Sequence, residues 1–82
     1  MKLPIIRQLY QNHSAEHLEK ALSVLENFSE FRGITEEDLN VAGELITNIC
    51  GALEVHHEVN SGKSEKDALN GFAQKVMGSI DR

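Results

Sequence analysis

The segment from about Glu36 to Asn60 constrains the fold most, because its apolar residues recur with the period of an α-helix over its whole length. One apolar stripe, at alternating spacings of three and four, contains Leu39, Ala42, Ile46, Ile49 and Leu53. A second stripe beside it contains Val41, Leu45, Ala52, Val55 and Val59. The two stripes cover roughly 200° of the helix surface, whereas an outer helix needs an arc of only ~100°. We therefore expect a central helix that is packed on two sides.

Three other helices are predicted, over Pro4–Gln11, Ala15–Phe31 and Glu65–Ile80. Proline is tolerated in a first helical turn, because the N–H that it lacks has no partner there. No strand pattern and no internal repeat is evident. The chain is therefore predicted to be all-α: a small bundle of three main helices plus a short N-terminal helix, with a long central third helix. It forms one domain over residues 1–82, and its short loops favour antiparallel neighbours.

The boundaries of these helices carry recognisable signals. Ser14, Thr35 and Ser64 each stand where a side-chain oxygen can accept a hydrogen bond from the first turn of the following helix. Gly33 and Gly62 are expected to end the second and third helices.

Glycines inside the helices suggest a place of close contact. Gly43 and Gly51 lie in the third helix, and Gly71 and Gly78 lie seven apart in the fourth. Each costs about 1 kcal/mol against alanine in a helix interior. We expect the two pairs to mark a tight crossing between the third and fourth helices, so that Gly71→Leu destabilises the protein strongly.

Composition narrows the class of protein. The chain has 82 residues, 13 acids against 8 bases, a net charge of −5 and one cysteine. Nucleic-acid binding is disfavoured, because it requires a basic face. No apolar run approaches the ~20 residues of a membrane span, and the N-terminus lacks the pattern of a signal peptide. A cytoplasmic protein is therefore expected, without intrachain disulfides and with a thin core.

The wide apolar arc of the third helix leaves two interpretations open. Either the flanking helices cover it, or part of it meets the same helix of a second subunit in a two-fold dimer. The candidate interface residues share the second stripe and its edge: Val41, Leu45, Ile49, Ala52, Val55, His56 and Val59. A homodimer is favoured because self-association is a common remedy for a small core.

Two adjacent histidines near the end of this helix raise the question of a metal site. His56 and His57 diverge by ~100° around a helix, so they do not converge on one ion. Glu54 and His57 form one Glu-x-x-His unit, whereas carboxylate metal sites in helical bundles typically use two. We expect a structural histidine pair at a helix end. A metal or small-molecule site at Glu54, His56 and His57 is the alternative.

No motif for catalysis is found. The patterns of a hydrolase nucleophile and of a phosphate-binding loop are absent, and no cofactor is implied. Cys50 lies in an apolar helix, where a lone thiol is usually inert. The leading interpretation is a non-enzymatic interaction module that associates with itself or with another protein.

The runs GELITNICGALEVH (43–56), DALNGFAQKVMGSID (67–81) and the opening KLPIIRQL resemble a small family of all-helical proteins from Bacteroidetes bacteria, a domain of unknown function. The resemblance covers nearly the whole chain and carries over no catalytic residue. It implies a cytoplasmic accessory or partner-binding role beside thioredoxin-type and peroxiredoxin-type proteins. This role allows a third interpretation, in which the protein is a thiol accessory that acts through Cys50.

Overall fold

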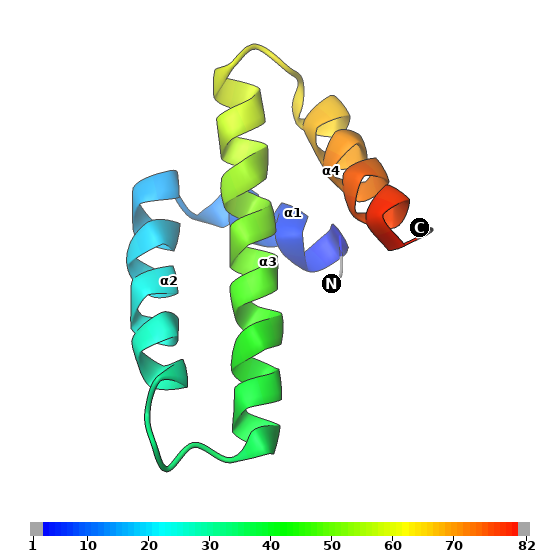
Figure 1. Ribbon diagram of the computed structural model, residues 1–82. Helices are drawn as coiled ribbons and strands as arrows, with labels where there is room; N and C mark the ends of the chain where they lie inside the picture. The colour runs from blue at the N-terminus through cyan, green and yellow to red at the C-terminus, as the bar shows by residue number, and fades with distance from the viewer. Residues whose placement is uncertain (1–2, 81–82) are drawn as a thin grey trace.

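The computed structural model describes residues 3–80, with side chains through Lys75, and within this range it contains four helices and no strand (Figure 1). They are α1 (Leu3–Asn12), α2 (Ala15–Ser29), α3 (Glu36–Asn60) and α4 (Glu65–Ile80). The predicted fold class is therefore confirmed, including the short first helix and the long third one.

The three predicted N-caps are all present. The N–H groups of His17, Asp38 and Asp67 donate to the hydroxyls of Ser14, Thr35 and Ser64, each at 3.1 Å. Each bond satisfies a donor that has no partner inside its helix.

The ends of two helices differ in their chemistry. α2 stops at Ser29 rather than at Phe31, and its last turn is closed by the Glu30 N–H, which donates to the carbonyls of Asn27 and Phe28. The prediction for this end was therefore two residues too long. α3 ends as predicted, with Gly62 at a φ of 116°, a conformation that glycine adopts without steric cost.

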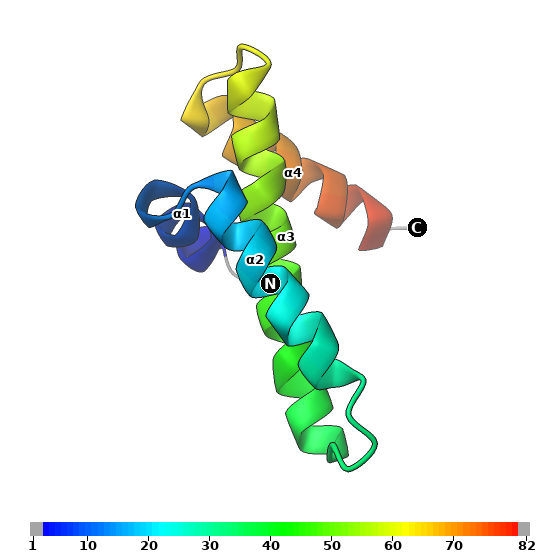
Figure 2. The same ribbon diagram turned by 90° about the vertical axis from the view of Figure 1, so that its left-hand side faces the viewer.

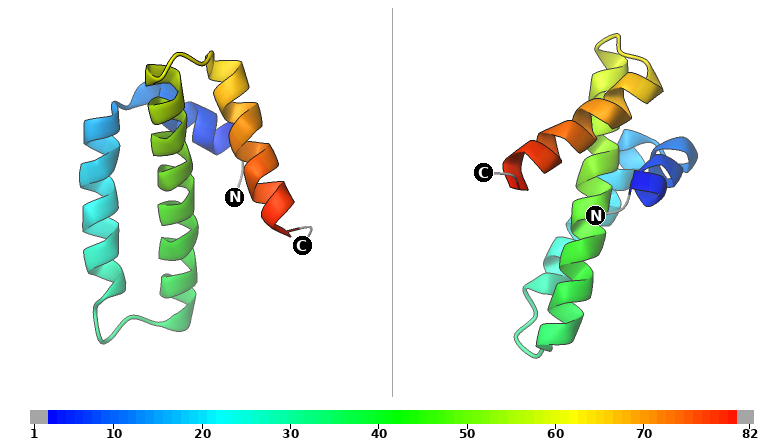
Figure 3. Two further views of the ribbon diagram at one scale, coloured as in Figure 1. Left: turned by 45° about the horizontal axis from the view of Figure 1, so that its top comes forward. Right: turned by 90° about the vertical axis from the view of Figure 1, so that its right-hand side faces the viewer.

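The helices α2 and α3 form an antiparallel hairpin, and α1 and α4 pack on only one end of it (Figures 1 and 2). α1 crosses behind α3 as seen in Figure 1. α4 starts on the same side of α3 as α1 and then runs obliquely to the other side (Figure 3, right). The end of the hairpin that carries the α2–α3 loop is therefore a single layer of two helices.

The core lies where all four helices meet. Its buried side chains come from each helix in turn: Ile6, Leu18, Ile49, Ala52, Val55 and Ala68. All of the α3 members belong to the half of that helix nearer to α4, so the core is displaced to one end of the molecule.

The close approach between helices is at Gly51 and not at Gly71. A Cβ at Gly51 would lie 2.8 Å from Cδ1 of Ile6 and 3.1 Å from the Phe72 ring, whereas one at Gly71 would meet nothing within 4 Å. The prediction of a tight crossing at Gly71 is therefore wrong, and Gly78 lies outside the residues whose side chains are described. Helical spacing identifies neighbouring glycines, but only the packing shows which of them faces another helix.

Candidate functional site

His56 is bound within its own chain. Its Nε2 lies 2.7 Å from the carbonyl oxygen of His13, and because a carbonyl only accepts, this nitrogen carries the hydrogen. The imidazole also contacts the Tyr10 ring, with centroids 4.5 Å apart and planes tilted by 51°. His56 thus ties α3 to the junction between α1 and α2.

The other members of the proposed metal site point elsewhere. Glu54 pairs with Lys75 of α4 at 2.9 Å, and His57 is exposed. Among the residues that the structure describes, no group of three His, Cys, Asp or Glu side chains lies close enough to hold a metal ion. Glu54, His56 and His57 are therefore placed in three different directions and not around one point.

One ion pair lies at the turn that joins α3 to α4, and a second joins the two helices. Lys63 lies 2.9 Å from Glu58, and the hydrogen bond and charge of Lys63 lower the pKa of the Glu58 carboxyl. The hydrogen bond and charge of Glu54 raise the pKa of Lys75 in the same way. Both pairs are solvent-exposed, so their contribution to stability is small.

Cys50 is exposed. Partial burial of the sulfur raises the pKa of this thiol, and the charge of Glu26 raises it further. A raised pKa keeps the group in its unreactive thiol form at neutral pH.

The predicted interface residues separate into two sets along α3. Ile49, Ala52 and Val55 are buried in the chain's own core, and Val59 packs against that core. His56 is partly buried and bonded to His13, and Val41 and Leu45 are the most exposed of the seven, at 54% and 46%.

The reason is the position of α1 on α3. Residues seven apart lie on nearly the same side of a helix, so Leu45 shares its side with Ala52, and Val41 with Asn48. Ala52 and Asn48 are buried, whereas Leu45 and Val41 lie beyond the reach of α1. The second apolar stripe is therefore covered at one end and bare at the other.

Apolar residues of α2 extend this bare surface. In α2, Val24 and Phe28 come directly before Leu25 and Ser29, which face α3. In α3, Val41 and Leu45 come directly before Ala42 and Ile46, which face α2. Antiparallel helices are related by a two-fold axis normal to their layer. Side chains rotated in the same sense from the contact therefore emerge on the same face. We call this surface the hairpin face: Val24, Phe28, Phe31, Val41 and Leu45.

The hairpin face consists of exposed apolar side chains. Its five members are 46–69% exposed, and Val24, Phe28 and Phe31 line a shallow groove of about 550 Å³ together with Asn27 and Glu30. Ile5 of α1, at 38% exposure, adds a further apolar side chain on the same side of the molecule. Sequence reasoning missed Val24 and Phe31, although with Phe28 they form a stripe of their own at spacings of four and three.

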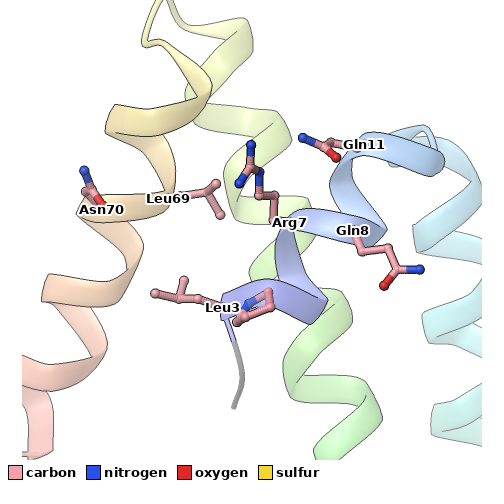
Figure 4. A pocket seen from close by; sticks show the side chains of 7 residues that line it. Leu3, Arg7, Gln8, Gln11, Leu69 and Asn70 are labelled. Atoms are coloured by element: carbon pink, nitrogen blue, oxygen red, sulfur yellow. The ribbon is translucent and has the colours of Figure 1, made fainter.

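A second concavity lies between α1 and α4 and is weaker as a candidate. It has a volume of about 470 Å³, and Leu3, Pro4, Arg7, Gln8, Gln11, Leu69 and Asn70 line it (Figure 4). Glu65 engages two of its polar groups, accepting from Gln11 at 2.8 Å and lying 3.6 Å from Arg7. Two of the four polar side chains that line this groove, Arg7 and Gln11, are therefore already engaged within the chain.

Comparisons with known proteins identify a family and give no activity. A family model described as "Family of unknown function (DUF6952)" matches residues 1–81. No curated protein and no solved structure matches the chain. Within the described residues, none of the helices has the length and apolar character needed to cross a membrane.

Proposed function

The chain belongs to the DUF6952 family of unknown function, and we propose that it is a non-enzymatic helical interaction module that pairs with a second copy of itself through the hairpin face. The observation that carries this proposal is the bare apolar surface on a hairpin that is only one layer thick. Three polar side chains near the end of α3 are compatible with it, because His56, Glu54 and Glu58 are engaged in contacts within the chain.

The size of the hairpin face fits an interface. A whole Phe side chain amounts to 150–250 Å², so five half-exposed apolar side chains leave roughly 500 Å² of accessible surface. This is about the size of the largest apolar patch on a typical monomer, roughly 300–600 Å², and such patches are often functional. A stable dimer buries about 800 Å² per partner, which an apolar centre of this size and a polar rim would supply.

The position of the core also favours a partner. A chain this small buries only about 60–65% of the surface that its unfolded form exposes. Here the core occupies one end, and the hairpin face is the apolar surface that the fold leaves without a layer. A second hairpin packed on it would complete a four-helix arrangement, which is a common way to bury two such faces.

Sedimentation velocity tests the proposal. We expect the chain, of 9.1 kDa, to sediment as a dimer at micromolar concentration. Leu45→Glu places a charge in the centre of the hairpin face and is expected to give a folded monomer, with a dissociation constant raised at least tenfold. The side chain is already half exposed in the single chain, so circular dichroism should stay helical.

Leu39→Glu is the matched control. Leu39 is 45% exposed against 46% for Leu45, but it is rotated to the other side of the α2 contact. This variant should remain dimeric. A 9.1 kDa species for the unmodified chain at every concentration, or equal dissociation by both variants, contradicts the proposal.

We extend this proposal to the cellular role of the protein. The accessory role beside thioredoxin-type proteins, in the cytoplasm of a bacteroidete, is what the family resemblance implies. A self-associating helical module is compatible with that role and does not require the Cys50 thiol to react.

A further inference from the structure

We propose that the two copies pack antiparallel, with the α2–α3 loop of each hairpin lying beneath α1 of the other; this inference rests on the dimer proposed above. Three observations carry it: the side on which α1 lies, the length of the bare hairpin, and the distribution of charge.

The first observation is that α1 stands on the same side of the layer as the hairpin face. Ala52 and Asn48, which share that side of α3 with Leu45 and Val41, are buried where α1 crosses. Figure 2 shows α1 projecting to one side of the α2–α3 layer. α1 is thus a shoulder that rises above the hairpin face by about one helix diameter, 10–12 Å.

A parallel two-fold dimer would bring the two shoulders together at the same height. The α1 helices would then collide, or they would hold the two hairpin faces apart by more than the 8–10 Å at which helices pack. In an antiparallel dimer the shoulders lie at opposite ends, and the faces meet between them.

The second observation is the length of the bare hairpin. α3 extends from Glu36 to Asn48 before α1 covers it, which at 1.5 Å per residue is about 18 Å. Because both copies have the same bare length, each hairpin fills the recess below the other's shoulder. Four helices would then be in contact over about three turns.

Ile5 of α1 lines the space beneath α1 that the hairpin of the second copy would occupy. It is separated from Arg7 by two residues, or about 200° around α1. Arg7 pairs with Glu65 at the start of α4, so Ile5 is directed towards the α2–α3 loop. Its exposed apolar side chain would therefore meet the hairpin end of the second copy.

The third observation is electrostatic. Residues 23–47 contain six acids (Glu26, Glu30, Glu36, Glu37, Asp38 and Glu44) and one base, Arg32, and so carry a net charge of −5. This equals the net charge of the whole chain, because the remaining residues contain seven acids and seven bases. Parallel packing would place two such hairpin ends side by side, whereas antiparallel packing separates them and lowers their repulsion.

Distances between spin labels test the arrangement. In a Cys50→Ser background, a label at Asn60→Cys reports the far end of α3, and a label at Asn40→Cys reports the middle of the bare hairpin. Both positions are exposed. For antiparallel packing we expect about 50 Å between the two Asn60 labels, from the rise of α3, and less than about 30 Å between the two Asn40 labels.

Three results separate the two proposals, and any other combination of distances contradicts antiparallel packing. A long Asn60 distance with a short Asn40 distance supports antiparallel packing. Short distances at both positions overturn this inference and leave the dimer intact. If neither position shows dipolar coupling at the concentrations used for sedimentation of the unlabelled chain, both the dimer and the antiparallel packing are overturned. Sedimentation of each labelled variant shows that the label itself has not changed the association.

Discussion

Gly51 shows how a single residue sets the distance between helices. It is the point at which Ile6 of α1 and Phe72 of α4 both approach α3, and Ile6 is fully buried, so its side chain has no space to move aside. The backbone of α3 thus forms part of the core surface here, and glycine is the residue that permits it.

Gly51→Val is expected to lower the free energy of unfolding by about 1–3 kcal/mol, the usual cost of overpacking a core. Urea unfolding measures it. Gly43→Val is the matched control in the same helix, because a Cβ there meets nothing within 4 Å, and it should be close to neutral. Equal changes in the two variants would show that the contact of Gly51 with Ile6 and Phe72 does not decide the cost.

Cys50 gives a test of the thiol-accessory interpretation through pH. Partial burial and Glu26 raise its pKa, so less thiolate is present at neutral pH than for a thiol in an unfolded chain. We expect the native thiol to react with a disulfide reagent more slowly than the urea-unfolded chain at pH 7.5, with the rate rising at higher pH. Glu26→Gln should increase the native rate. A native thiol that reacts faster than the unfolded one would favour a redox role.

At the scale of elements, α3 is one helix with two environments. The half near α4 is covered by three helices, and the half near the α2–α3 loop by α2 alone (Figure 1). The boundary between them is set by α1, whose position depends on its contacts with α3. His56 makes one of those contacts, to Tyr10, and a second to His13, directly after α1.

His56→Ala should therefore loosen the junction of α1 and α2 against α3. Loss of a hydrogen bond and a ring contact is expected to cost about 1–2 kcal/mol. For a domain of this size the melting temperature should fall by roughly 5–15 °C. His57→Ala is the control, because His57 is the exposed neighbour on the same helix and should change the melting temperature little. A zinc-dependent rise in melting temperature, lost in both variants, would restore the metal-site interpretation.

At the scale of the whole molecule, shape and charge are both uneven. The core is at one end, and the net charge of −5 is at the other, in the same part of the hairpin that carries the hairpin face. With a thickness of 18 Å along its shortest axis, the molecule is flat. Because of these properties, a second copy is a suitable cover for the hairpin face. The uneven shape and charge also favour one direction of packing over the other.

The sequence by itself determined the helices and their caps, because hydrophobic period and capping depend on residues within a few positions of one another. Thr35 and Gly62 bound α3 as predicted, and the width of the apolar arc correctly indicated a helix packed on two sides. The end of α2 was misplaced at Phe31, since no strong breaker stands there and the last turn tightens at Glu30.

Only the tertiary structure decided which part of that arc is covered. Ala52 and Leu45 belong to the same stripe and are equivalent by period, yet one is buried and the other is half exposed. The difference comes from where α1 crosses α3, and that is fixed by the fit of Ile6 against Gly51, two residues far apart in the chain. Periodicity gives the direction of a side chain around its helix, but it carries no information about how far along that helix a neighbour extends.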